Sequence, residues 1–252
     1  MEMVLLTAFG VGGATVIGSL IGFTFKKISH KFNDAILGFA AGIMLAAAIL
    51  GLIVPSIDYG GKFGVFITIT GIMVGALFLN VVDRLTPHLH NLVGVDVEKH
   101  SYNAASLNKI LLFVAAIAIH NFPEGIAAGV SFGTDNIGDA ITVASGIALQ
   151  NIPEGMIIIA PLIGAGVSKR RTFFIGLCTG LVEVAGTLFG YFAVSVSTFI
   201  LPFALAFAGG TMLYVISDEM IPETHSHGYE RSATYALLIG FCVMLLMDYV
   251  IG

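Results

Sequence analysis

The chain has 252 residues, of which 57% are hydrophobic and only 11% are charged, and its mean hydropathy is +0.96. This composition lies outside the range of soluble domains and is typical of integral membrane proteins. The net charge is −5, and no basic stripe indicates nucleic acid as a partner.

Eight apolar runs of roughly 20 residues each are long enough to cross a ~30 Å hydrocarbon core. The first run has no basic segment before it and is too long for the apolar part of a signal peptide, so we expect it to be retained as a transmembrane helix. Because the connections are short, we expect an all-α integral membrane protein with one transmembrane domain over residues 1–252. In chain order, the predicted helices are Val4–Phe25, Ala35–Val54, Phe63–Val82, Ile110–Phe132, Ala140–Ile163, Phe173–Val194, Phe199–Ile221 and Thr234–Ile251.

The basic residues predict the orientation of the chain. With eight spans, both termini lie on one side of the membrane, and alternate connections lie on the other. Ten of the eleven basic residues fall in or beside those alternate connections, and only Lys62 falls on the side of the termini. Since basic residues are enriched on the cytoplasmic side, both termini should be extracytoplasmic. The ten are Lys26, Lys27, Lys31, Arg84, Lys99, Lys109, Lys169, Arg170, Arg171 and Arg231.

Two similar motifs lie thirty residues apart in the fourth and fifth predicted spans. Residues 120–125 read H-N-F-P-E-G, and residues 150–155 read Q-N-I-P-E-G. A carboxylate deep in lipid costs at least ~2.5–3.5 kcal/mol, so by default it indicates a functional site. Two such carboxylates in matching motifs therefore predict a site inside the membrane.

The spacing within the motifs brings polar groups to shared helix faces. His120 and Glu124 are four residues apart, as are Gln150 and Glu154, and residues four apart lie on nearly the same face of a helix. Glu183 lies at the middle of the sixth span, at the same depth. Imidazole, carboxylate and amide oxygen together suit divalent metals such as Zn²⁺, Fe²⁺, Mn²⁺ or Co²⁺. We therefore expect a metal-binding centre near the midplane.

A proline interrupts each motif. Pro123 and Pro153 cannot donate a backbone N–H, which leaves the carbonyls of Ile119 and Leu149 without their helical partners. Such interrupted helices are tolerated where protein or a cavity satisfies the carbonyls. Transporters commonly build cation sites from them, so we expect spans four and five to be kinked around the centre.

The paired motifs and the eight spans, together with extracytoplasmic termini, resemble the ZIP (Zrt/Irt-like) family of divalent metal transporters. The segment Ser217–His225, which reads S-D-E-M-I-P-E-T-H, is similar to the prokaryotic GufA-like branch of that family. The resemblance covers essentially the whole chain. It implies secondary transport of zinc, and also of iron, manganese, cobalt or cadmium, toward the cytoplasm by a homodimer in the cell membrane.

The resemblance also implies a centre for two metal ions, bridged by the glutamates of spans four and five. The first site would consist of His120, Glu124, Gln150 and Glu154. Asn121, Glu124, Asn151, Glu154 and Glu183 would form the second. Asn151 stands where some relatives have an acidic residue, which predicts a weaker second site. Gln150 stands where many eukaryotic members have histidine, which predicts broad selectivity.

Further polar residues fall on the predicted cytoplasmic side. Asp83, Asp218, Glu219 and His225 are candidates for an exit route, and six of the seven histidines fall in connections on this side. The simpler interpretation is a solvated loop with interfacial charges. The six histidines are His30, His88, His90, His100, His225 and His227.

Two other functions use the same residues. An intramembrane metalloenzyme would use the metal to activate water, but the sequence has no H-E-x-x-H motif. A metal efflux carrier or channel would share the scaffold, and the sequence alone does not separate it from an importer.

Overall fold

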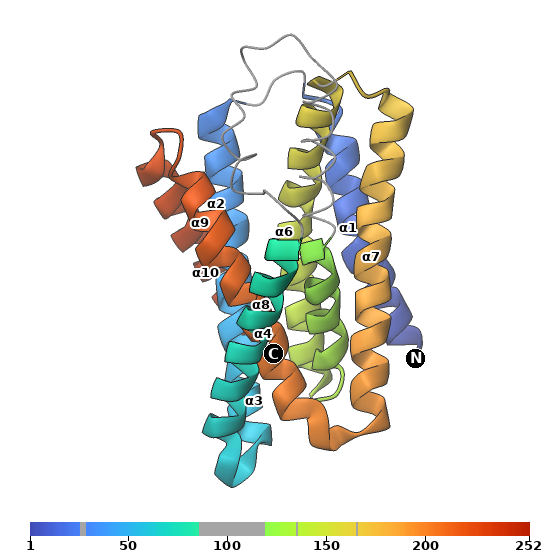
Figure 1. Ribbon diagram of the computed structural model, residues 1–252, viewed down its shortest axis with the longest axis vertical. Helices are drawn as coiled ribbons and strands as arrows, with labels where there is room; N and C mark the ends of the chain where they lie inside the picture. The colour runs from blue at the N-terminus through green and yellow to red at the C-terminus, as the bar shows by residue number, and fades with distance from the viewer. Residues whose placement is uncertain (26–28, 86–118, 135, 165) are drawn as a thin grey trace.

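The computed structural model describes residues 1–25, 29–85, 119–134, 136–164 and 166–252 (Figure 1). Within these ranges, every regular element is a helix. In chain order they are α1 (Glu2–Gly22), α2 (His30–Ala46), η1 (Ala47–Ile53), α3 (Val54–Tyr59), η2 (Gly61–Phe63), α4 (Gly64–Leu85), a helical segment at 119–131, α6 (Ile137–Gly164), α7 (Lys169–Val196), η3 (Thr198–Ile200), α8 (Leu201–Val215), η4 (Ile216–Met220), α9 (Ile221–Thr224) and α10 (Glu230–Ile251).

Seven stretches of the described chain are long and apolar enough to cross a membrane, which confirms seven of the eight predicted spans. The fourth prediction, Ile110–Phe132, lies partly outside the described residues. The seven stretches are Glu2–Gly22, His30–Tyr59, Gly61–Val82, Ile137–Gly164, Lys169–Val196, Thr198–Thr224 and Glu230–Ile251.

Several helices begin earlier than the apolar runs predict, because polar residues form their first turns. The Ser29 hydroxyl accepts a hydrogen bond from Phe32 N at 3.3 Å, and α2 therefore starts at His30. Likewise, the Ser168 hydroxyl accepts a hydrogen bond from Arg171 N at 3.5 Å and caps the start of α7. Such capping satisfies a backbone donor at the start of a helix, so the helix extends beyond the membrane-spanning run.

The helices pack in pairs. α1 packs against α6 and α7, α2 against α10, and α4 against α8. Figure 1 shows α1, α6 and α7 on one side of the bundle and α2, α9 and α10 on the other. Contacts between α2 and α6 connect the two groups.

Glycines allow these close pairings. A Cβ at Gly18 would overlap the carbonyl of Ile152 in α6, and one at Gly42 would overlap the carbonyl of Leu237 in α10. Close backbone approach at small residues stabilises helix pairs in membranes. Both glycines therefore serve the packing of neighbouring helices.

Two π-helical segments, η1 and η4, each end two residues before a proline. η1 ends at Ile53 before Pro55, and η4 ends at Met220 before Pro222. A proline lacks an N–H and clashes with the carbonyl four residues earlier, and the wider π turn relieves that clash. The chain therefore stays helical across both prolines.

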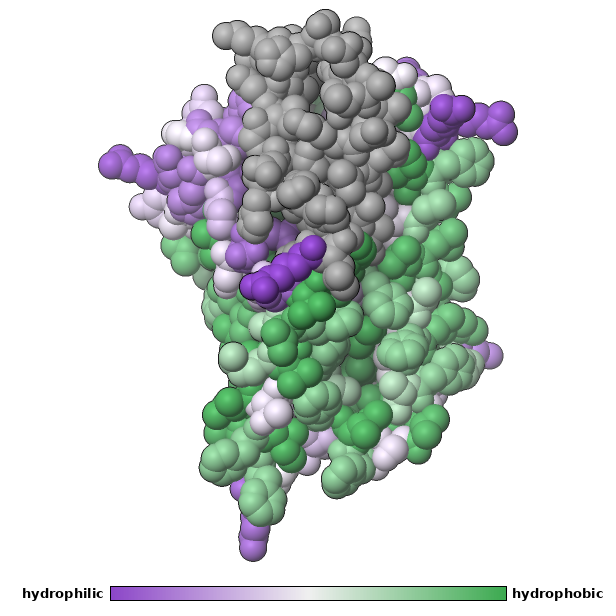
Figure 2. All heavy atoms as spheres, viewed as in Figure 1, coloured by the Kyte–Doolittle hydropathy of each residue, from purple (hydrophilic) through white to green (hydrophobic). Residues whose placement is uncertain are grey.

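Apolar side chains cover the middle of the molecule, and polar residues gather mainly at one end (Figure 2). The outward faces of α1, α4 and α10 expose Leu6, Phe66, Leu77 and Leu246, each more than half accessible. Exposed apolar surface of this extent fits a protein surrounded by lipid.

Candidate metal centre

The predicted ligands come from three helical segments. Segment 119–131 carries His120, Asn121 and Glu124, whereas α6 carries the corresponding residues of the second motif and α7 carries Glu183. His120, Asn121, Glu124, Gln150, Asn151 and Glu183 are buried, and Glu154 is half-buried. The sequence therefore places these polar groups in the interior of the bundle.

Glu183 is the point at which four helices meet. Asn121 Nδ2 donates to Glu183 Oε1, and Asn151 Nδ2 donates to Oε2 at 2.5 Å. Thr15 in α1 also donates its hydroxyl to Oε1, at 2.5 Å. Glu183 and both motif asparagines are thus in direct contact, and the family resemblance had grouped these three residues. Thr15 was not predicted, because a threonine in a long apolar helix carries no motif.

The glycine that follows each motif glutamate explains how these helices approach. A Cβ at Gly125 would overlap the carbonyl of Glu183 in α7, and one at Gly155 would overlap the carbonyl of Thr15 in α1. Each motif therefore places its polar residues within five positions of a close backbone crossing. The crossings bring Glu183 and Thr15 to the asparagines.

Four oxygen atoms in this interior have no hydrogen-bond partner among the described residues. They are Asn121 Oδ1, Glu124 Oε2, Gln150 Oε1 and Asn151 Oδ1. A buried acceptor without a partner costs free energy. The asparagine oxygens are free because the NH₂ groups donate to Glu183. A cation would satisfy such oxygens.

The carboxylates of the centre lie near one another. Glu124 is close enough to Glu154 and Glu183 to interact electrostatically. Among the described residues, no three His, Cys, Asp or Glu side chains are already grouped so as to hold a metal. An ion at this position would therefore need the amide oxygens in addition to the carboxylates.

Glu219 borders the centre. Its Oε1 lies 3.0 Å from His120 Nε2. The sequence placed Glu219 only on an exit route, at the end of the seventh span. The wide turn of η4 instead places it beside His120, one of the predicted metal ligands.

Comparison with known proteins agrees with this arrangement. Residues 95–248 match the model of a family described as ZIP Zinc transporter. Zinc transporter GufA of Myxococcus xanthus is 39% identical over 254 residues, covering 98% of each chain. This chain belongs to the ZIP family. Zinc transporter ZIPB of Bordetella bronchiseptica is 36% identical, over 95% of this chain and 78% of the relative, and zinc transporter ZupT of Chlorobaculum parvum is 35% identical, over 92% and 91%.

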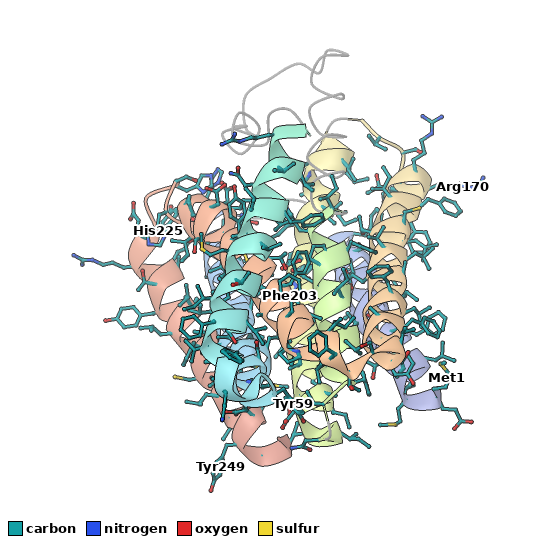
Figure 3. All side chains as sticks on the ribbon, turned by 60° about the horizontal axis from the view of Figure 1, so that its bottom comes forward. Met1, Tyr59, Arg170, Phe203, His225 and Tyr249 are labelled. Carbon is teal, nitrogen blue, oxygen red and sulfur yellow. The ribbon has the colours of Figure 1, made fainter. Side chains whose placement is uncertain are left out.

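The remaining exit-route candidates of this ZIP protein lie on α4, on η4 and in the connection after α9. Asp218 is half-buried in η4, and Asp83 lies in α4, with its side chain outside the described ones. His225 is exposed, and its Nδ1 lies 2.8 Å from the carbonyl of Ile221. Figure 3 shows it at the edge of the bundle. His88, His90 and His100 lie outside the described residues.

Proposed function

We propose that this chain carries divalent transition metal ions, zinc foremost, across the cell membrane toward the cytoplasm, and that the centre around Glu183 is its binding site. The observation that carries this proposal is the set of three unpartnered buried amide oxygens, of Asn121, Gln150 and Asn151, beside the carboxylates of Glu124, Glu154 and Glu183. Family membership supports transport. The relatives are named as zinc transporters, which does not favour the metalloenzyme alternative.

The chemistry of the centre suits a transported ion. Carboxylate, imidazole and amide oxygen bind borderline divalent metals without the thiolates that would hold softer ions. A transport site must also release its ion, so neutral amide oxygens in place of further carboxylates favour turnover. The same ligands bind protons, so metal and protons compete.

The two-ion arrangement is part of the proposal. In it, His120, Glu124, Gln150 and Glu154 hold the first ion, and the asparagines with the three glutamates hold the second. Asn151 offers the second ion only an amide oxygen, because its NH₂ group donates to Glu183. The second ion is therefore held more weakly than the first.

The proposed orientation places both termini outside the cytoplasm and treats residues 1–252 as one transport domain. Arg170 lies at the end of the bundle opposite Tyr59 (Figure 3). Lys62 lies close to Tyr59 in the chain, so the basic residues of α7 and Lys62 are at opposite ends. This separation supports the positive-inside assignment. The family resemblance further suggests a homodimer.

The test is uptake of Zn²⁺ into proteoliposomes containing the purified protein, with other divalent metals as competitors. We expect Glu124→Ala and Glu154→Ala to abolish nearly all uptake, since each glutamate serves both proposed ions. Glu2→Ala, at an exposed position in the first turn of α1, is the matched control. Normal uptake by a folded Glu124→Ala protein would refute the proposed centre.

The direction of transport is tested in a separate experiment. Proteoliposomes loaded with zinc report efflux, and a membrane potential of either sign reports a passive channel. A carrier for uptake saturates with external zinc and is inhibited by competing metals. Flux that rises linearly with zinc and follows the potential would favour the channel alternative.

A further inference from the structure

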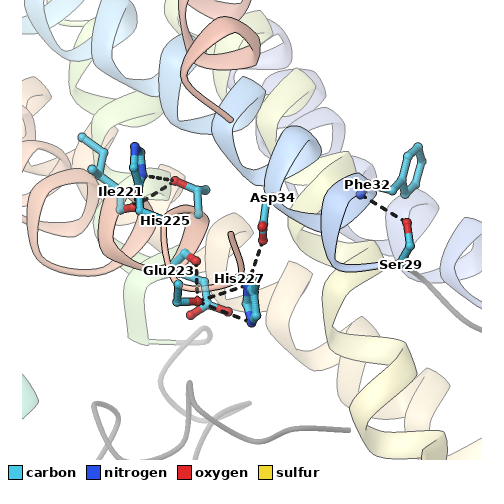
Figure 4. Close-up of polar contacts among 9 residues, drawn as sticks. Ser29, Phe32, Asp34, Ile221, Glu223, His225 and His227 are labelled. Carbon is cyan, nitrogen blue, oxygen red and sulfur yellow. Dashed lines mark hydrogen bonds and ion pairs between the residues drawn. The ribbon is translucent and has the colours of Figure 1, made fainter. Parts of the chain in front are cut away.

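A second group of ionisable side chains lies apart from the metal centre, where the start of α2 meets the connection between α9 and α10. His30 and Asp34 come from α2, Glu223 comes from α9, and His227 comes from the connection. Figure 4 shows Asp34, Glu223 and His227 gathered at this junction. None of these four residues contributes to the centre around Glu183.

The local structure explains how the four residues meet. The Ser29 cap fixes the start of α2, so His30 and Asp34, four residues apart, lie on one face of its first turns. His227 Nδ1 lies 3.0 Å from Asp34 Oδ1. The rings of His30 and His227 stack with their centroids 4.4 Å apart. Glu223 lies close enough to interact electrostatically with both Asp34 and His227.

The carboxylates of this group are only partly satisfied. Asp34 is completely buried, and its Oδ2 has no hydrogen-bond partner. Glu223 Oε2 is also buried without one. The side chain that pairs with Asp34 is a histidine, which carries a charge only when it is protonated. Two buried carboxylate oxygens beside two imidazoles are a donor set that suits a divalent cation.

We propose that His30, Asp34, Glu223 and His227 form a second binding site for a divalent transition metal ion of the zinc class, separate from the transport centre. Two imidazoles and two carboxylates are common ligands of four-coordinate zinc. In the structure His227 contacts both Asp34 and His30, and Glu223 lies close enough to interact electrostatically with Asp34 and His227. Among the described residues, no three His, Cys, Asp or Glu side chains already surround one position at metal-binding distance, and these four are no exception.

The rearrangement that an ion requires at the Asp34–His227 contact is small. Two ligand atoms of a tetrahedral zinc ion, each at ~2.0–2.1 Å, lie about 3.3 Å apart. Asp34 Oδ1 and His227 Nδ1 are already 3.0 Å apart, so they need to separate by only a few tenths of an ångström. Glu223 lies on a helix of four residues that is followed directly by the connection, so α9 can adjust to bring this carboxylate to the ion.

Occupancy of this site has a consequence for the centre. An ion there joins α2 to α9, and α9 directly follows η4, which carries Glu219 against His120. Metal bound at the junction therefore restrains the element that borders the transport site. This consequence rests on the proposed transport function, whereas binding at the junction does not.

The experiment measures zinc bound per chain by equilibrium dialysis and elemental analysis of the detergent-purified full-length protein. The reference is the double variant Glu124→Gln, Glu154→Gln, which disables the proposed centre. We expect this reference to retain one zinc per chain, and the addition of His227→Gln or Asp34→Asn to remove it. His227→Gln tests the site even if the buried Asp34 cannot be replaced, because the His227 side chain is 21% exposed.

The control is Asp58→Asn, an exposed aspartate in α3, which should leave the retained zinc unchanged. A reference that binds no zinc, or one that keeps its zinc after His227→Gln, overturns the second site. If the transport centre is wrong and the second site is right, Glu124→Gln and Glu154→Gln will not reduce the zinc bound by the wild type, but His227→Gln will still remove one equivalent. The two proposals therefore fail separately.

Discussion

The Glu183 carboxylate accepts three side-chain hydrogen bonds from the described residues, and none of the three donors belongs to its own helix. The donors come from α1, α6 and segment 119–131. Three donors of fixed position hold a carboxylate in one orientation. Because the NH₂ groups of Asn121 and Asn151 donate to Glu183, their amide oxygens remain without a hydrogen-bond partner among the described residues.

Thr15→Val tests this orientation at the level of one hydrogen bond. Valine keeps the shape of threonine but removes the donor to Glu183 Oε1, at a cost of about 1–3 kcal/mol for a hydrogen bond to a charged group. We expect a lower melting temperature and zinc affinity weakened by roughly 10-fold. Thr70→Val, at an exposed position of α4, is the control. Wild-type zinc affinity in Thr15→Val would contradict an orienting role.

Asn151→Asp tests the second proposed ion. The substitution adds a carboxylate beside Glu183 and removes the donor to its Oε2. We expect the metal-free protein to melt at a lower temperature, zinc to raise that temperature more than in the wild type, and turnover to stay the same or fall. Calorimetry gives the affinity and stoichiometry. If both are unchanged, no second ion binds beside Asn151.

At the scale of elements, η4 decides which way Glu219 points. A π turn accommodates one residue more than an α turn, so residues before and after it are rotated by about 100° relative to a continuous α-helix. Pro222 makes the wide turn favourable, because it has no N–H for the carbonyl of Asp218 and would clash with it. The contact between Glu219 and His120 therefore depends on a proline three residues beyond Glu219.

Pro222→Ala should restore the α-helical hydrogen bond and rotate Glu219 away from His120. We expect the protein to remain folded, with zinc uptake reduced by roughly 10-fold, as for the loss of one charged contact. Pro202→Ala is the matched control, because Pro202 lies in the first turn of α8, where no helical N–H is missing. Full uptake by Pro222→Ala would show that the position of Glu219 does not matter.

At the scale of the whole molecule, polar and apolar surfaces are separated along the length of the bundle (Figure 2). One group of helices consists of α1, α6 and α7, and the other of α2 and α10. The two groups meet where α2 contacts α6. His120 and Glu219 also face each other from different elements. The centre therefore depends on the packing of distant parts of the chain.

The proposed orientation predicts which ends of the bundle a membrane-impermeant maleimide can reach in intact cells. In a Cys178→Ala, Cys242→Ala background, Glu2→Cys and Lys62→Cys should be labelled. Arg170→Cys should be labelled only after the membrane is permeabilised. All three replaced residues are exposed in the structure. Labelling of Arg170→Cys alone in intact cells would reverse the orientation.

The sequence by itself determined that this is an integral membrane protein, where the seven spans of the described residues lie, and which residues form the two motifs. These properties are local: hydropathy is summed over a single run, and a spacing of four places His120 and Glu124 on one face whatever surrounds them. The helix ends were predicted less well. Caps such as Ser29 and Ser168 extend helices beyond the apolar runs.

Only the tertiary structure decided which residues from distant segments meet. Thr15 reaches Glu183 across 168 positions, and His227 reaches Asp34 across 193. Such contacts depend on how closely helices cross, and the crossings depend on glycines such as Gly125 and Gly155 that admit a neighbouring backbone. Hydropathy and spacing within one helix contain no information on which partner will occupy that space, because packing is a property of two surfaces.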